Sequence, residues 1–119
     1  MINFEFGDVV LVSFPFTDLE GIKRRPAVVV SPVEYQRNRR DAILMAITSR
    51  IRTSLDFAEA EITQWAEAGL LKPSVFKPLL FTLEQQRILK VMGSLQRQDR
   101  EHLHAILSQI IGQISRSAP

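Results

Sequence analysis

Pro26-Ala27-Val28-Val29-Val30 predicts a β-protein, because three successive valines behind a proline are typical of a buried β-strand. Two similar apolar runs flank it, Val9-Val10-Leu11-Val12 on one side and Ala42-Ile43-Leu44-Met45-Ala46-Ile47 on the other. We therefore predict three strands in this half of the chain. The polar connection from Pro15 to Arg25 is longer than a tight hairpin requires, and we expect a loop that can close over a ligand.

The middle of the chain has weaker patterns. Leu55 to Ile62 combines the alternation of a strand with the Ala and Glu content of a helix, and we interpret it as a strand. Thr63 can cap a short helical turn that ends at Gly69. Further on, Pro78 predicts an edge or a bulge, and Ile88 to Met92 predicts one more strand.

The tail has the clearest pattern. Its apolar residues recur at the spacing of one helix face, at Leu103, Ile106, Leu107, Ile110, Ile111 and Ile114. Asp99 is a suitable N-cap for this helix. We therefore expect a mostly β protein, with several strands followed by one amphipathic C-terminal helix that packs on the sheet.

Composition fits one ordinary folded domain over residues 1–119. The chain is 45% hydrophobic and 24% charged, which is average for a globular protein. It has no cysteine, which excludes disulfide bonds, thiolate–zinc sites and cysteine nucleophiles. No apolar run approaches the ~20 residues of a membrane-spanning helix, and no basic and apolar leader is visible. We expect a cytoplasmic protein with no membrane partner.

Positive charge is concentrated in the first half of the chain although the net charge is only +2. The clusters are Lys23-Arg24-Arg25, Arg37 with Arg39-Arg40, and Arg50 with Arg52. Such clusters suit a phosphate backbone, and the alternative interpretation is that they are solvated loop ends.

Three segments together resemble, in order and spacing, the signature of the MazF/PemK family of toxins. They are Gly7-Asp8-Val9-Val10-Leu11-Val12, then residues 23–31 with Arg25-Pro26 at their centre, then Ile47-Thr48-Ser49-Arg50. The stretch from Trp65 to Val75 is similar to the middle of the same family, and Gly93-Ser94-Leu95 to its end. The resemblance spans nearly the whole chain, whereas each segment alone would be weak.

The resemblance implies an SH3-like barrel of the CcdB/PemK type with a C-terminal helix. It also implies the toxin of a type II toxin–antitoxin system, usually a homodimer, which a cognate antitoxin protein inhibits. The implied activity is sequence-specific, metal-independent cleavage of single-stranded RNA without a cofactor. The catalytic arginine of the family corresponds to Arg25 and its catalytic threonine to Thr48. In isolation, each would be interpreted as an ordinary strand-end or turn residue.

The chemistry is compatible with these two groups. RNA carries its own nucleophile, the 2′-hydroxyl, so cleavage requires proton transfer and charge stabilisation but no metal, and yields 2′,3′-cyclic phosphate and 5′-hydroxyl ends. Arg25 offers a planar fork of donors for phosphate oxygens, and Thr48 can hold the phosphate in line. A role of Arg25 in proton transfer stays open. Candidate RNA contacts are Thr17, Lys23, Arg24, Ser49, Arg50 and Arg52.

Other residues are weaker candidates. We interpret His102 and His104 as solvated helix residues, and Trp65 as packing into a core or an interface rather than stacking a base. Lys77-Pro78-Leu79-Leu80 stands where many family members carry an acidic residue and a glutamine, so the RNA motif cannot be transferred. Two rival functions remain: a non-catalytic, CcdB-like poison of DNA gyrase, and an SH3-like module that binds nucleic acid or protein.

Overall fold

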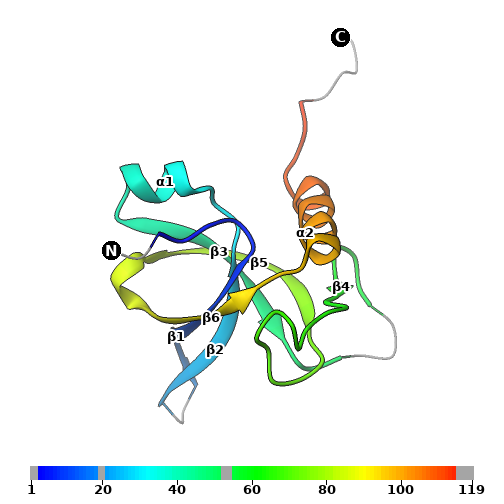
Figure 1. The fold of residues 1–119 in the computed structure, drawn as a ribbon, viewed down its shortest axis with the longest axis horizontal. Coiled ribbons are helices and arrows are strands. Elements are labelled where there is room, and N and C mark those ends of the chain that lie inside the picture. Colours follow the sequence, from blue (N-terminus) through cyan, green and yellow to red (C-terminus); the bar gives the residue numbers. More distant parts are fainter. Residues whose placement is uncertain (1–2, 19–20, 52–54, 115–119) are drawn as a thin grey trace.

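Six strands form one antiparallel sheet in the computed structural model, which describes residues 3–18, 21–51 and 55–114, without the side chains of 14–18, 21 and 22. The strands are β1 (Asp8–Asp18), β2 (Gly21–Val29), β3 (Asp41–Thr48), β4 (Ala60–Glu61), β5 (Val75–Glu84) and β6 (Ile88–Ser94). Their order in the sheet is β4-β5-β3-β2-β1-β6. The sheet curls into a barrel, beside which α2 (Arg97–Ile110) packs (Figure 1). Within the described ranges, no helix has the length and apolarity needed to cross a bilayer.

The three strands predicted from the valine-rich and apolar runs are confirmed as β1, β2 and β3. The loop predicted between Pro15 and Arg25 is wrong. β1 continues to Asp18 and β2 begins at Gly21, so the two strands project from the barrel as a hairpin arm (Figure 1). Pairing across the hairpin overrides the turn preference of the local sequence. The register shifts between Phe14 and Asp18, where β1 carries two residues more than β2.

The strand predicted from Leu55 to Ile62 is wrong over most of its length. Only Ala60 and Glu61 pair with β5, and Ala58 has a positive φ of 61°, which a strand does not allow. The irregularity predicted at Pro78 is confirmed. Met45 pairs with Leu80 and Ile47 with Phe76, so residues 77–79 form a bulge in β5. The strand predicted at Ile88 is confirmed as β6.

Two short helical segments escaped the sequence patterns because each is too short to show a period. α1 (Val33–Asn38) follows Pro32, and the 3-10 turn η1 (Gln85–Arg87) joins β5 to β6. The buried side chain of Gln36 fastens α1 to the barrel, since its Nε2 donates to the carbonyls of Phe4 and Ser31, both at 3.0 Å.

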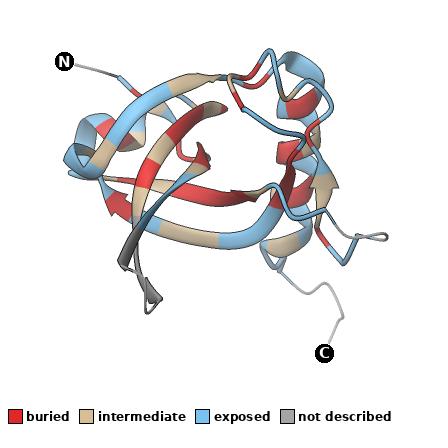
Figure 2. Cartoon of the chain, turned by 90° about the horizontal axis from the view of Figure 1, so that it is seen from below, coloured by how far each residue is buried: buried red, intermediate tan, exposed pale blue. Residues whose placement is uncertain are grey.

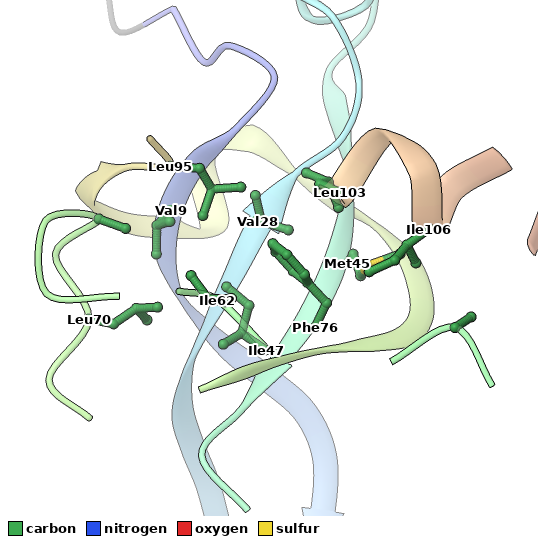
Figure 3. Close-up of a cluster of buried hydrophobic side chains, with 12 residues drawn as sticks. Val9, Val28, Met45, Ile47, Ile62, Leu70, Phe76, Leu95, Leu103 and Ile106 are labelled. Carbon is green, nitrogen blue, oxygen red and sulfur yellow. The ribbon is translucent and has the colours of Figure 1, made fainter. Parts of the chain in front are cut away.

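Alternate residues of the central strands face two separate cores. Val10, Ala27, Val29, Leu44 and Ala46 lie on the inner face and form the barrel core. Their neighbours along the strands lie on the opposite face, in a helix-side core that α2 and the segment before β5 cover (Figures 2 and 3). Its members include Val9, Val28, Met45, Ile47, Ile62, Leu70, Phe76, Leu95, Leu103 and Ile106.

The C-terminal helix is confirmed, but its N-cap is wrong. α2 begins behind Gln96, so Asp99 lies inside its first turn and is fully buried. There the carboxylate of Asp99 caps a different element. It accepts the backbone N–H and the hydroxyl of Thr63, both at 2.9 Å, and the N–H of Gln64 at 2.8 Å. The turn predicted at Thr63 is therefore capped from α2 rather than by its own threonine.

This turn spans residues 63–69 and is held at its other end by two glycines. Gly69 has a φ of +89°, and a Cβ there would lie 2.2 Å from the carbonyl oxygen of Met92. A Cβ on Gly93 would lie 2.3 Å from the carbonyl oxygen of Ala68. The turn and β6 thus touch backbone to backbone, which positions the residues that follow Gly69.

Candidate active site

A cleft of about 540 Å³ lies where β2 begins and β3 ends. Its apolar lining comes from Leu11, Pro26, Ile47, Leu70, Leu71 and Met92. Five cationic side chains line it as well, and no Asp or Glu is among its described residues; the cations are Lys23, Arg24, Arg25, Arg50 and Lys72. A cluster of cations attracts phosphate.

Arg25 and Thr48 line the same cleft from two neighbouring strands. In β2 and β3, Val29 pairs with Leu44, Val28 with Met45 and Ala27 with Ala46. The β2–β3 ladder ends at this pair, beside Pro26, which has no N–H to donate. Arg25 and Thr48 lie two residues beyond the last pair on their own strands, and both line the cleft.

The Thr48 hydroxyl has a defined orientation. Its Oγ1 accepts the backbone N–H of Arg50 at 3.1 Å, a bond typical of a threonine turn. This bond uses a lone pair of the hydroxyl and not its proton, so the O–H can still donate to a ligand. Arg25 is exposed and Thr48 is half-buried. The same turn therefore brings a donor and the Arg50 side chain to the cleft.

Six of the eight residues predicted for the site meet in this cleft. They are Lys23, Arg24, Arg25, Thr48, Ser49 and Arg50. The side chain of Thr17 and the whole of Arg52 lie outside the described residues. The sequence reasoning missed the segment from Leu70 to Ser74, which forms one wall of the cleft and contributes Lys72. Its position depends on the contacts of Gly69 and of Asp99, which no local pattern reveals.

The weaker candidates lie away from this cleft. His104 is exposed on α2, and Nδ1 of His102 lies 3.7 Å from the Asp99 carboxylate. Trp65 packs against the helix-side core as expected, but it is only partly buried and also lines a small hollow next to the cleft. Among the residues that the structure describes, no group of three or more His, Cys, Asp or Glu side chains could hold a metal ion.

The sequence and the fold were compared with known proteins. Residues 5–111 match the family described as PemK-like, MazF-like toxin of type II toxin–antitoxin system. No curated protein sequence matches the chain. The fold is similar to that of a chain in a MazE–MazF complex from Deinococcus radiodurans, with 22% sequence identity and a TM-score of 0.71. The match covers 91% of this chain and 95% of the other.

Mycobacterial structures are similar too. The Mycobacterium tuberculosis toxin MazF-mt6 is 17% identical, with coverages of 85% and 92% and a TM-score of 0.68. An endoribonuclease in complex with its cognate antitoxin, from a mycobacterial species, is 14% identical, with coverages of 91% and 92% and a TM-score of 0.69. Together with the six-stranded sheet, these likenesses confirm the CcdB/PemK-like barrel with its amphipathic C-terminal helix. Because the family match takes in nearly all of the sequence, the chain belongs to the PemK-like, MazF-like toxins of type II toxin–antitoxin systems.

Proposed function

We propose that this toxin is a metal-independent endoribonuclease that cleaves single-stranded RNA at specific sequences. The observation that carries the proposal is the cleft that Arg25 and Thr48 line together with four further cationic side chains. Family membership supports RNA cleavage, since relatives of the same fold are named endoribonucleases.

In the proposed reaction, the 2′-hydroxyl of one nucleotide gives up its proton to water and attacks the adjacent phosphorus, while the bond to the 5′ oxygen breaks and that oxygen takes up a proton from water. Arg25 stabilises the charge that develops on the phosphate oxygens, for which a bidentate guanidinium is well suited. Thr48 donates its hydroxyl to the phosphate and holds it in line. The products are a 2′,3′-cyclic phosphate and a 5′-hydroxyl.

The remaining cations of the cleft bind the RNA backbone on either side of the scissile bond. Lys23, Arg24, Arg50 and Lys72 belong to this group, and Ser49 lines the cleft with them. Thr17 and Arg52 stay proposed contacts on sequence grounds alone. Because phosphate contacts carry no base information, these residues explain affinity and not the choice of sequence.

The deciding experiment is cleavage of a long single-stranded RNA by purified toxin in EDTA, with the cut ends mapped. Arg25→Ala should lower the rate by about 100-fold or more, because a donor to the transition state is lost. Arg87→Ala is the matched control, since Arg87 is exposed and does not line the cleft. Well-folded wild-type toxin that cuts no RNA would refute the proposal and favour the gyrase poison or the binding module.

We also propose a cognate antitoxin as the protein partner and a homodimer as the active form. The antitoxin is supported by the related complexes, in which a toxin of this fold is bound to its antitoxin. Addition of the cognate antitoxin should abolish cleavage, and sedimentation velocity of the free toxin should give the mass of two chains. A monomer that cleaves RNA would remove the dimer from the proposal.

A further inference from the structure

A second, smaller hollow of about 160 Å³ lies next to the cleft, and we call it the side pocket. Apolar groups form most of it: Trp65, Pro73, Ile51 and the buried Ile62. Polar atoms come from Glu61, Thr63 and Ser74. The volume is well below the ~300 Å³ of sites for drug-sized ligands, so it suits a single flat ring system.

The side pocket lies beside the cleft, because consecutive residues of two segments line the two hollows in turn. Thr48, Ser49 and Arg50 line the cleft, and the next residue, Ile51, lines the side pocket. On the facing wall, Lys72 lines the cleft, Pro73 lines the side pocket, and Ser74 lines both. A nucleotide whose phosphate lies in the cleft therefore has a ring-sized, largely apolar hollow beside it.

The polar side chains of the side pocket are placed to accept hydrogen bonds from a ligand, because their own protons are already donated within the protein. Thr63 already donates its hydroxyl proton to Asp99 at 2.9 Å, and Ser74 donates its own to the carbonyl of Lys72 at 2.9 Å. Both oxygens keep lone pairs, and the exposed Glu61 carboxylate only accepts. A matching ligand must therefore be flat, able to stack on Trp65, and rich in donors along one edge.

We propose that the side pocket is a binding subsite for a guanine base of the RNA, an inference that rests on the proposed function. Guanine presents two adjacent donors, N1–H and the N2 amino group, on its Watson–Crick edge, which a carboxylate can accept as a pair. Adenine and cytosine offer one amino group each on that edge, and uracil one N–H. Glu61 thus selects the base, while Trp65 and Pro73 hold its faces.

The test uses fluorescence, because Trp65 is the single tryptophan of the chain. The 5′-monophosphates of guanosine, adenosine, cytidine and uridine are titrated into the wild-type toxin. We expect a saturable change that GMP produces at concentrations about ten-fold lower than the others, since a bidentate base contact discriminates to about that extent. No saturable change with any nucleotide, or the same change with all four, would overturn the proposal.

Two variants sharpen the result. Glu61→Gln should weaken GMP binding about ten-fold to the level of the other nucleotides, because an amide cannot accept at both positions. Glu67→Gln is the matched control, an exposed glutamate near the same turn that does not line the side pocket, and it should bind GMP like the wild type. Wild-type affinity for GMP in Glu61→Gln would refute the role of Glu61.

The outcome separates this inference from the proposed function, because a nucleoside monophosphate has no phosphodiester bond to cut. Toxin that binds GMP but cuts no RNA would refute the nuclease and keep the guanine subsite. Toxin that cuts RNA without a guanine at a fixed distance from the cut, and that shows no preference for GMP, would refute the subsite and keep the nuclease.

Discussion

At the scale of single residues, Asp99 shows how a buried charge becomes a structural contact. Its carboxylate is fully buried and accepts three hydrogen bonds from Thr63 and Gln64. In Asp99→Asn, one acceptor becomes an amide donor that faces another donor. We expect a loss of unfolding free energy on the order of 2–4 kcal/mol. Urea denaturation measures it.

The control for Asp99 is Glu101→Gln. Glu101 is exposed on the same helix and forms a loose ion pair with Arg97 at 3.7 Å. Exposed pairs contribute roughly 0–1 kcal/mol, so this variant should unfold close to the wild-type midpoint. Equal midpoints for the two variants would mean that the Asp99 contacts do not stabilise the fold.

A second residue, Asp41, makes the free energy of unfolding depend on pH in the acid range. Its desolvation favours the protonated form, but hydrogen bonds from the Tyr35 hydroxyl at 3.0 Å and from Arg39 at 3.2 Å outweigh this and lower its pKa. The folded pKa lies below the unfolded one, so the charged group stabilises the fold at neutral pH. That contribution should be lost as the pH falls below about 4. Asp41→Asn should flatten this part of a plot of unfolding free energy against pH; an unchanged plot would contradict the assignment.

At the scale of elements, the contact between the 63–69 turn and β6 requires two glycines. Gly93→Ala should cost about 1–3 kcal/mol, because a methyl group would meet the Ala68 carbonyl, which is backbone and cannot rotate away. Gly69→Ala should cost more, since its positive φ adds about 1–2 kcal/mol. Gly112→Ala is the control, with open space around it. Thermal unfolding distinguishes the three, and a Gly93→Ala variant as stable as Gly112→Ala would contradict the close contact.

Elements that repeat a period could be predicted from the sequence, and elements made by distant partners could not. The valine-rich strands and α2 follow from local patterns, and the basic triplet and Thr48 were predicted as residues of the cleft. By contrast, β4 exists only because Ala60 and Glu61 meet β5, and the Lys72 wall depends on the contacts of Asp99 and Gly69. A loop was predicted in place of the hairpin arm because Pro15 and Asp18 usually occur in turns, whereas here the two strands pair.

At the scale of the whole molecule, the charge of the cleft predicts salt-sensitive binding. For single strands, each phosphate contact contributes about 0.7 to the slope of log affinity against log salt. Lys72→Ala should therefore reduce that slope by about 0.7, measured with an RNA whose 2′-hydroxyls are methylated so that it cannot be cut. Arg97→Ala, on α2 and outside the cleft, should keep the wild-type slope. A slope unchanged in Lys72→Ala would remove this residue from the RNA path.

The two cores on opposite faces of the sheet have a consequence for the fidelity of assembly. If β2 slipped by one residue against β3, Val28 and Met45 would no longer be paired, and Arg25 would shift relative to Thr48. The same slip would mismatch the barrel core and the helix-side core at once. A chain with a slipped register would therefore pack both cores poorly and be less stable than the correctly paired fold. Correct packing of the two cores therefore also sets the relative positions of the two proposed catalytic residues. A stable toxin with a slipped strand register should not accumulate.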